Sequence, residues 1–149
     1  MAFTILRAGP SDFDLACEAV LEVHGRASLD AVALAEFVAD PMRFLLLATH
    51  DGLVVGSLSG YALQRPHRPD PQFLLYEIDV RPEWRRQRIG KALVNRFIAE
   101  ARAASAFEVW VLTNRSNAAA MALYASCGLR MENSDDAMWS VPVADVNPR

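Results

Sequence analysis

The sequence contains only two cysteines among 149 residues, and it has no uninterrupted apolar run near the roughly 20 residues that a membrane-spanning helix needs. Its first residues also lack the basic segment followed by an apolar one that a secretory signal requires. The low cysteine count argues against a disulfide scaffold, because small secreted domains depend on several disulfides. The lack of a long apolar run argues against a membrane partner. We therefore expect a cytoplasmic protein with free thiols.

Disorder is also excluded, because a hydrophobic fraction of 52% supplies ample apolar surface to bury. Charged residues make up 22% of the chain and aromatic residues 9%, as in ordinary soluble domains. A length of 149 residues is typical of one domain. Since the sequence shows no internal repeat, low-complexity tract or linker, we expect a single domain spanning residues 1–149.

The net charge of −3 is unevenly distributed along the chain. Residues 1–84 carry 6 basic and 12 acidic side chains, whereas residues 85–149 carry 9 basic and 6 acidic ones, so the two parts have charges of −6 and +3. This asymmetry favours two ligands of opposite charge meeting in one cleft; the alternative is a surface of randomly scattered charges. A nucleic-acid partner is disfavoured, because an acidic domain lacks a broad cationic footprint.

Hydrophobic periodicity and turn signals predict a mixture of helices and strands. Strands are expected at residues 3–7, 43–49, 53–63, 73–80 and 107–112, with one or two more ending near Val143. Helices are expected from Pro10 to about His24-Gly25, from Ser28 or Asp30 to Asp40, from Ile89 to Ala104 and from Asn117 to Ser126. His50-Asp-Gly indicates a hairpin turn, and the proline-rich residues 64–72 indicate a loop.

The most informative segment is residues 76–91, where a strand ends, a proline follows and an arginine-rich turn leads into a helix. The first amide groups of a helix have no partner within it, and together with the helix dipole they attract anions. The forked guanidinium groups of Arg85, Arg86 and Arg88 add donors suited to a pyrophosphate. Gly90 allows a ligand to approach the backbone closely. The alternative is a surface turn whose arginines are only solvated.

Two motifs in this half of the chain resemble those of the GNAT superfamily of N-acyltransferases. The turn Arg85-Arg-Gln-Arg-Ile-Gly90 resembles the acyl-CoA signature Arg/Gln-x-x-Gly-x-Gly/Ala, with Arg88 standing where the superfamily has glycine. Downstream, Asn117-Ala-Ala-Ala-Met-Ala-Leu-Tyr-Ala-Ser-Cys-Gly-Leu129 resembles the second motif, Asn-x-x-Ala-x-x-Leu-Tyr-x-x-x-Gly-Phe/Leu. The two motifs occur in the order that the superfamily has.

The resemblance covers nearly the whole chain and implies an α/β (α+β) fold. In that fold a mixed, mostly antiparallel sheet is splayed between its fourth and fifth strands and flanked by about four helices. The resemblance also implies acetyl-CoA as the cosubstrate. The residues that it assigns to cofactor binding are Ile78, Val80, Arg85, Arg86, Gln87, Arg88, Ile89, Gly90, Lys91 and Asn117.

Within the superfamily the chain most resembles the type I aminoglycoside 3-N-acetyltransferases. Tyr76-Glu-Ile-Asp-Val80 and Glu83-Trp-Arg-Arg-Gln87 are similar to their fourth strand and the turn after it. The resemblance implies transfer of acetyl to an aminoglycoside or a similar small cationic amine, as in antibiotic resistance. Where those enzymes tend to carry acids before the last helix, this chain has Asn114 and Asn117, which remove negative charge. A homodimer is an expectation from the superfamily alone.

N-acetylation needs a base, because an alkyl ammonium with a pKa of about 10 is protonated at neutral pH and cannot attack a thioester. Glu77 is the candidate, since a glutamate within an otherwise apolar strand is expected to face a polar cleft. Asp79 lies two residues further on, faces the same side of a regular strand and is the second candidate. The alternative for Glu77 is an ion pair with a neighbouring arginine.

The leaving thiolate needs a proton donor, and the resemblance assigns that role to Tyr124. The alternative for Tyr124 is a core tyrosine on an alanine-rich helix. Asn117, at the start of that helix, is assigned a contact to the pantetheine or phosphate part of the cofactor; its alternative is a helix N-cap.

Four acids fall in regions that line the acceptor side in the superfamily, and the alternative for each is a solvated charge. These candidate substrate-binding residues are Glu22, Asp30, Asp135 and Asp136. The three histidines are scattered without the spacing of metal ligands, so we expect no metal. Neither Cys17 nor Cys127 is paired with a histidine in the sequence, and both are expected to pack.

Two other functions stay open at this stage. One is acetylation of a peptide α-amine, a lysine or a polyamine. The other is a catalytically silent module that binds acyl-CoA as a sensor. The presence of both Glu77 and Tyr124 argues against a silent module.

Overall fold

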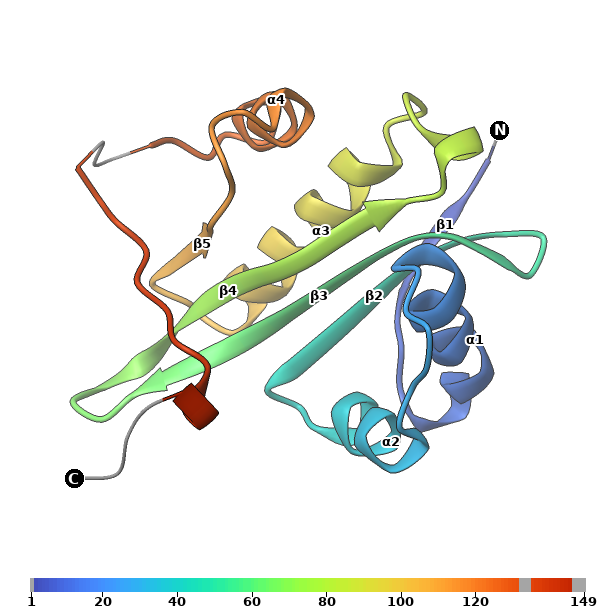
Figure 1. The fold of residues 1–149 in the computed structure, drawn as a ribbon, viewed down its shortest axis with the longest axis horizontal. Coiled ribbons are helices and arrows are strands. Elements are labelled where there is room, and N and C mark those ends of the chain that lie inside the picture. Colours follow the sequence, from blue (N-terminus) through green and yellow to red (C-terminus); the bar gives the residue numbers. More distant parts are fainter. Residues whose placement is uncertain (1, 132–134, 146–149) are drawn as a thin grey trace.

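The structure, a computed structural model, describes residues 2–131 and 135–145. Five strands form one sheet in the order β1-β2-β3-β4-β5, in which every neighbouring pair is antiparallel except the parallel pair β4 and β5 (Figure 1). The strands are β1 (Thr4–Arg7), β2 (Arg43–His50), β3 (Leu53–Arg65), β4 (Arg68–Val80) and β5 (Glu108–Val111). The helices are α1 (Phe13–Glu18), α2 (Ala31–Ala39), α3 (Ile89–Ala103) and α4 (Ala118–Ser126). The predicted mixed sheet with four helices is confirmed.

The first predicted helix is present as three consecutive segments. A 3₁₀ turn at Pro10–Asp12 precedes α1, and a π-helical turn at Ala19–Val23 continues it. The chain then turns at Gly25, whose φ of +64° is a value that glycine adopts readily after a helix. Asp30 caps α2 by accepting the amide hydrogen three residues on at 2.9 Å. None of the helices in the described residues is long and apolar enough to cross a membrane.

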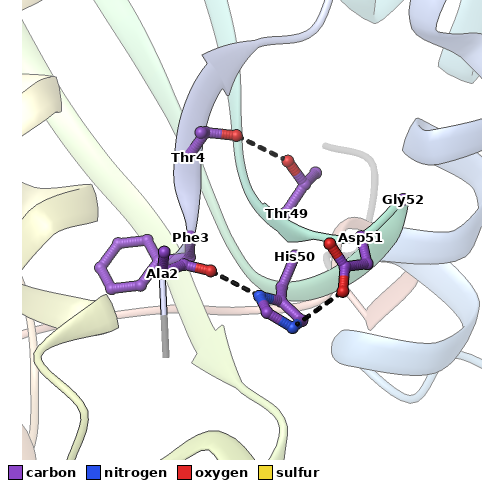
Figure 2. A pocket seen from close by; sticks show the side chains of 7 residues that line it. All are labelled: Ala2, Phe3, Thr4, Thr49, His50, Asp51 and Gly52. Atoms are coloured by element: carbon purple, nitrogen blue, oxygen red, sulfur yellow. Dashed lines mark hydrogen bonds and ion pairs between the residues drawn. The ribbon is translucent and has the colours of Figure 1, made fainter.

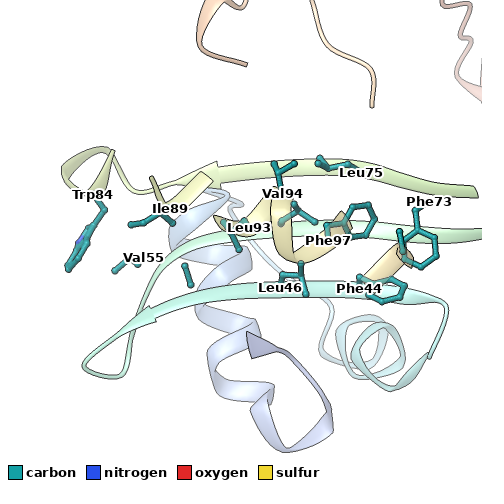
Figure 3. Packing of buried hydrophobic residues seen from close by; sticks show 13 residues of the cluster. Phe44, Leu46, Val55, Phe73, Leu75, Trp84, Ile89, Leu93, Val94 and Phe97 are labelled. Carbon is teal, nitrogen blue, oxygen red and sulfur yellow. The ribbon is translucent and has the colours of Figure 1, made fainter. Parts of the chain in front are cut away.

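Each face of the sheet carries its own core, because α3 packs on one face and α1 and α2 cover the other (Figure 1). The buried cluster on the α3 face, most of which is labelled in Figure 3, consists of Phe44, Leu46, Ala48, Val55, Leu58, Phe73, Leu75, Trp84, Ile89, Leu93, Val94, Phe97 and Ala101. The cluster on the other face consists of Ala8, Ala16, Ala19, Leu34, Val38, Leu45, Leu47 and Val54. Successive residues of β2 alternate between the two clusters, which explains why that strand is continuously apolar.

The prediction of a loop over residues 64–72 is wrong, because most of this segment is strand. β3 extends to Arg65 and β4 begins at Arg68, so a two-residue turn joins them. The carbonyl of Pro71 accepts an amide hydrogen at 2.8 Å from the residue before β5, on the edge away from β3. Proline has no amide hydrogen, but at Pro71 the backbone groups point away from β3. The proline therefore removes no hydrogen bond between β4 and β3. Asp70 pairs with both flanking arginines at 2.8 and 2.9 Å and holds the hairpin end together.

The strands predicted near the C-terminus are not found in residues 135–145, which contain a 3₁₀ turn at Val143–Asp145 and no strand. Trp139 is 92% exposed and Val141 is 58% exposed. An isolated extended segment has no partner for its backbone hydrogen bonds, and apolar alternation alone does not supply one. Residues 132–134, which that prediction also covered, lie outside the described residues.

A β-bulge interrupts β4 at Tyr76. Ser59 of β3 lies opposite Glu77, whereas the next residue of β3, Gly60, lies opposite Leu75. Tyr76 therefore has no partner of its own in the register, and the strand advances by one extra residue at this point.

The bulge changes which residues of β4 face each core. Before the bulge, Leu75 is buried in the cluster against α3. After it, Ile78 and Val80 pack against the same cluster, although they differ from Leu75 by an odd number of positions. Glu77 and Asp79 consequently point to the opposite face, which α1 and α2 cover.

β5 accompanies β4 over four residues only, pairing Gln72–Leu75 with Glu108–Val111. From Tyr76 to Val80, β3 is the one strand that neighbours β4 among the described residues, so the other edge of β4 is left without a strand. This divergence is the predicted splay between the fourth and fifth strands. It places an open strand edge near the start of α3.

Candidate active site

Glu77 and Asp79 face the end of the first helical segment, where His24 lies against both carboxylates. His24 Nδ1 is 3.2 Å from Asp79 Oδ2 and 3.6 Å from Glu77 Oε1. The side chain of His24 is 4% exposed, whereas those of Glu77 and Asp79 are 28% and 43% exposed. Because a carboxylate can only accept, His24 donates from Nδ1 to Asp79 and orients it. The expected pair of site acids is thus present on one face of β4.

Arg26, in the segment between α1 and α2, donates from Nη2 to Glu77 Oε1. This contact is the arginine ion pair that the sequence left open as the alternative for Glu77. The Arg26 side chain is 57% exposed, so the pair contributes only about 0–1 kcal/mol to stability and can be exchanged for another partner. The ligand atoms of His24, Glu77 and Asp79 lie within 4.8 Å of one another, close enough for a shared cation. The Arg26 guanidinium already provides positive charge at Glu77, one of the three residues that such a cation would contact.

Tyr124 lies on α4 and is half-buried against the core cluster of the α3 face. Burial, and then the negative charge of Asp79, raise the pKa of the Tyr124 phenol above its usual value of about 10. The phenol therefore keeps its proton at neutral pH, as a proton donor must. The ring of Tyr124 thus packs against the core, while the pKa of its hydroxyl depends in part on Asp79.

The arginine-rich turn adopts the backbone geometry of a glycine-containing turn although Arg88 replaces the glycine. Arg88 has a φ of +64° and Arg86 a φ of +62°, both in the left-handed region that glycine enters most easily. The carbonyl of Arg88 accepts the amide hydrogen of Ala92 at 3.0 Å, so the preceding amides of α3 have no partner within the helix. The exposed cations around these amides are Arg85, Arg86, Arg88 and Lys91.

The open edge of β4 presents backbone groups of two predicted cofactor residues. Arg81 donates its amide hydrogen to the carbonyl of Val55 on β3 at 2.9 Å. Because backbone groups alternate along a strand, the amides and carbonyls of Ile78 and Val80 point away from β3. The Val80 carbonyl accepts a hydrogen bond from Arg85 Nε at 3.1 Å, which agrees with that direction. An extended chain could therefore bond along this edge.

Three other predicted cofactor residues have structural roles of their own. Asn117 Oδ1 accepts the amide hydrogen three residues on at 3.1 Å, which is the N-cap role considered as its alternative. Gly90 lies where α3 meets α4, since a side chain there would contact Leu123 at 3.4 Å. Ile89 is buried in the core, so only its backbone is available to a ligand. Gln87 is partly exposed in the turn.

A pocket of about 290 Å³ lies beside Glu77, on the face covered by α1 and α2. Its lining is mostly apolar and aromatic and consists of Val20, His24, Leu29, Asp30, Ala33, Leu34, Phe37, Leu45, Ser59, Tyr61, Tyr76 and Glu77. Of the four acids predicted on the acceptor side, Asp30 lines this pocket. Glu22, Asp135 and Asp136 are exposed and do not line it.

A second, open pocket of about 360 Å³ lies at the start of β1 and the turn between β2 and β3 (Figure 2). Thr4 and Thr49 are joined there through their hydroxyls at 3.0 Å. The ring of His50 bonds to the carbonyl of Ala2 and lies 3.3 Å from Asp51. These polar groups are engaged with one another rather than with Glu77. Of these two pockets, the first is the one that Glu77 lines.

The sequence did not identify His24 and Arg26 as site residues. The interpretation of His24-Gly25 as a helix end is correct, but it gave the histidine no further role. His24 is 55 positions from Asp79, and Arg26 is 51 positions from Glu77. The one available signal was a cluster of polar residues immediately after an apolar helix.

The model of the Acetyltransferase (GNAT) family matches residues 12–129, a range that includes the strand, the turn and the tyrosine described above. The chain belongs to the GNAT acetyltransferase family. An uncharacterized N-acetyltransferase of Mycobacterium bovis is 31% identical over 127 residues, covering 82% of this chain and 78% of that relative. This GNAT protein is accordingly an acyltransferase, and the enzymes of its family use acetyl-CoA.

Solved GNAT structures share its fold while carrying names that indicate different acceptors. An aminoglycoside acetyltransferase, meta-AAC0020, from an uncultured soil metagenomic sample is 23% identical, with a TM-score of 0.79 over 94% of this chain and 96% of that one. The ribosomal-protein-alanine N-acetyltransferase of Brucella melitensis is 20% identical, with a TM-score of 0.71 over 93% of this chain and 100% of that one. At these identities the likeness shows the fold alone and not the acceptor.

Proposed function

We propose that this GNAT acetyltransferase moves the acetyl group of acetyl-CoA directly to a primary amine, with Glu77 as the base and Tyr124 as the acid. One observation supports this most strongly. β4 presents Glu77 to the acceptor pocket and the backbone of Ile78 and Val80 to its open edge, beside the cationic turn that begins α3. An amine and an anionic thioester would therefore meet at a single strand.

In the proposed reaction an ammonium group in the pocket first gives a proton to Glu77, directly or through water. The neutral nitrogen attacks the thioester carbonyl, a C–N bond forms and the C–S bond breaks. Tyr124 gives its proton to the leaving sulfur. The nitrogen loses two protons overall: one reaches solvent through Glu77, and the other restores the phenol. Burial, and then the charge of Asp79, which His24 contacts, raise the pKa of the Tyr124 phenol, so the phenol holds its proton until the sulfur leaves.

The size and lining of the pocket also bear on which class of amine is the acceptor. The pocket has a volume of about 290 Å³, at the small end of ligand sites, and is lined mainly by apolar side chains. These features favour a compact amine. An aminoglycoside, as in the type I 3-N enzymes that the sequence resembles, is the second candidate. The observation in its favour is a second carboxylate near Glu77, which lines the pocket: His24 lies against both Glu77 and Asp79.

The test is thiol release from acetyl-CoA with a panel of amines, comparing the natural chain with Glu77→Gln. The substitution removes the base, so we expect turnover at neutral pH to fall by about 10²–10⁴. Part of the rate should return at high pH, where more of the amine is already neutral. Glu36→Gln removes an exposed carboxylate from α2, outside the pocket, and should leave the rate unchanged.

Binding of acetyl-CoA without thiol release, for every amine tested, would contradict the proposal and favour a sensor module. Turnover confined to peptides or polyamines would keep the reaction and replace the acceptor. A Glu77→Gln variant with an unchanged pH–rate profile would remove Glu77 from the role of base.

A further inference from the structure

We infer that the acceptor is an α-amino acid with an aromatic or branched apolar side chain, whose ammonium binds Glu77 and whose carboxylate binds Arg26. This inference rests on the proposed function, since it names the amine that the same site would acetylate. The product would be an N-acetyl amino acid. Three observations lead to it: the aromatic wall of the pocket, the small number of charges in the lining, and the arginine that bonds to Glu77.

Three aromatic rings form a continuous wall beside Glu77. Phe37 and Tyr61 meet edge to face with centroids 5.7 Å apart, and Tyr61 and Tyr76 meet in the same way at 5.7 Å. Tyr76 is 65% exposed, so its ring is accessible to a ligand in the pocket. Because the bulge brings Tyr76 and Glu77 to the same face, the ring lies next to the carboxylate. An apolar side chain beside the reacting amine would cover this wall.

The charges of the pocket are too few for a polycation. The acidic and basic side chains in its lining are those of His24, Asp30 and Glu77, and Asp30 already caps α2. The remaining lining is apolar apart from the polar ends of Ser59 and the two tyrosines. Additional ammonium groups would be placed against apolar side chains, where an unpaired charge is costly. A molecule with one ammonium group fits this lining better.

Arg26 decides between a simple amine and an amino acid. Glu77 Oε1 already accepts a hydrogen bond from the Arg26 guanidinium, so an ammonium that binds Glu77 shares the carboxylate with a like charge. A simple amine brings nothing to offset that charge, and a polycation would be repelled by it. An α-amino acid carries its ammonium and carboxylate on one carbon, so it can occupy Glu77 and Arg26 together. A carboxylate also matches the forked donors of a guanidinium.

The same two charge contacts also explain how the product can leave the pocket. After acetyl transfer the nitrogen is a neutral amide and no longer binds Glu77 as a cation. One of the two charge contacts is thereby lost, and Arg26 can return to Glu77 as the product leaves. Arg26 is 57% exposed, so this exchange needs no movement of the core.

The experiment measures kcat/KM for phenylalanine, phenethylamine, alanine and a gentamicin-type aminoglycoside with acetyl-CoA. We expect phenylalanine to exceed phenethylamine by about 10- to 100-fold, the effect of a charge-assisted contact. Arg26→Gln should abolish that preference by lowering kcat/KM for phenylalanine while leaving phenethylamine equal or improved. Arg102→Gln, which removes an exposed arginine from the last turn of α3, should leave both values unchanged.

A second variant tests the aromatic wall. Tyr76→Ala removes a largely exposed ring, so folding should be preserved, and it should raise KM for phenylalanine without raising KM for alanine. The inference is overturned if phenethylamine or the aminoglycoside is preferred, or if Arg26→Gln lowers all substrates equally. Either result would leave the proposed acetyl transfer intact. Absence of thiol release with every amine would instead overturn the proposed function itself.

Discussion

At the scale of single residues, the site depends on how Asp79 is held. His24 fixes one oxygen of Asp79 through Nδ1, and the charge of Asp79 in turn acts on the phenol of Tyr124. The Nε2 atom of His24 is buried and has no hydrogen-bond partner among the described residues. A polar atom without a partner has a desolvation cost, which indicates that the histidine is kept for its other nitrogen. In the proposed mechanism His24 is therefore a positioning residue.

Tyr124→Phe should reduce turnover by about 10²–10⁴, the effect of losing a proton donor, while affinity for acetyl-CoA is unchanged. The variant removes only the hydroxyl, so the ring still packs against the core. Single-turnover kinetics and a binding titration would separate the two effects. If the chemical step proceeds at the original rate, Tyr124 is a core residue and another group protonates the thiolate.

The direction in which the pKa of Tyr124 is shifted predicts how the rate depends on pH. Burial and Asp79 both raise the pKa of Tyr124, so the donor stays protonated up to pH values above 10 and should not limit the rate at neutral pH. Asp79→Asn removes the second cause and should lower the pKa of the phenol toward its usual value. The alkaline limb of the kcat profile would then move to lower pH. A limb that stays in place would show that Tyr124 does not titrate in the reaction.

At the scale of elements, the contact between β3 and α3 positions the start of the helix. Gly56 and Gly60 lie on the strand where α3 crosses it, and side chains at either position would overlap residues of the helix. At Gly56 a Cβ would lie 2.8 Å from Ile89, the first residue of α3. The close approach that these glycines allow therefore fixes the position of the amides at the cationic turn.

Gly60→Ala should destabilise the protein by about 1–3 kcal/mol, because overpacking strains a well-packed core. The new Cβ would lie 2.5 Å from the ring of Phe97 and 2.9 Å from the carbonyl of Leu74. The corresponding fall in Tm is about 2–12 °C. Gly9→Ala is the matched control, since its Cβ would meet Asp12 only at 4.0 Å. Equal Tm values for the two variants would show that α3 can move away from β3.

At the scale of the whole molecule, the uneven charge of the sequence appears as acids on one face of β4 and cations in the turn that follows this strand. The acids Glu77 and Asp79 lie on the face covered by α1 and α2. The exposed cations of residues 85–91 surround the first amides of α3. An anionic cosubstrate and an amine can therefore approach without either crossing the site of the other.

Acetyl-CoA should raise the Tm of the whole domain, because a ligand that binds only the folded state stabilises it by about 2.7 kcal/mol at 100 times Kd. Replacing Arg86 and Arg88 together by glutamine should reduce the shift, and added salt should weaken it in the natural chain. Arg102→Gln provides the control for loss of charge elsewhere on α3. A shift that is absent in the natural chain, or unchanged in the double variant, would show that the turn does not bind the cosubstrate.

The sequence by itself determined most of the elements and the local chemistry of the site. Apolar periodicity located the helices and most strand bounds, because it reflects which side of each element is buried. The cationic turn was also predictable, since helix amides and nearby arginines are adjacent in the chain. Residues 64–72 and 135–145 were not predicted correctly. In both, the outcome depends on whether a neighbouring strand is present, and local composition does not contain that information.

Only the tertiary structure decided which side chains meet around Glu77. Phe73, Leu75, Glu77 and Asp79 alternate regularly in the sequence and would share one face of an unbroken strand. The bulge at Tyr76 sends the first two into the core against α3 and the last two to the opposite face, against His24, and it arises from the register with β3. Likewise, the contacts of the site with the end of the first helical segment join residues more than 50 positions apart. Such contacts are fixed by the packing of whole elements, which no local pattern specifies.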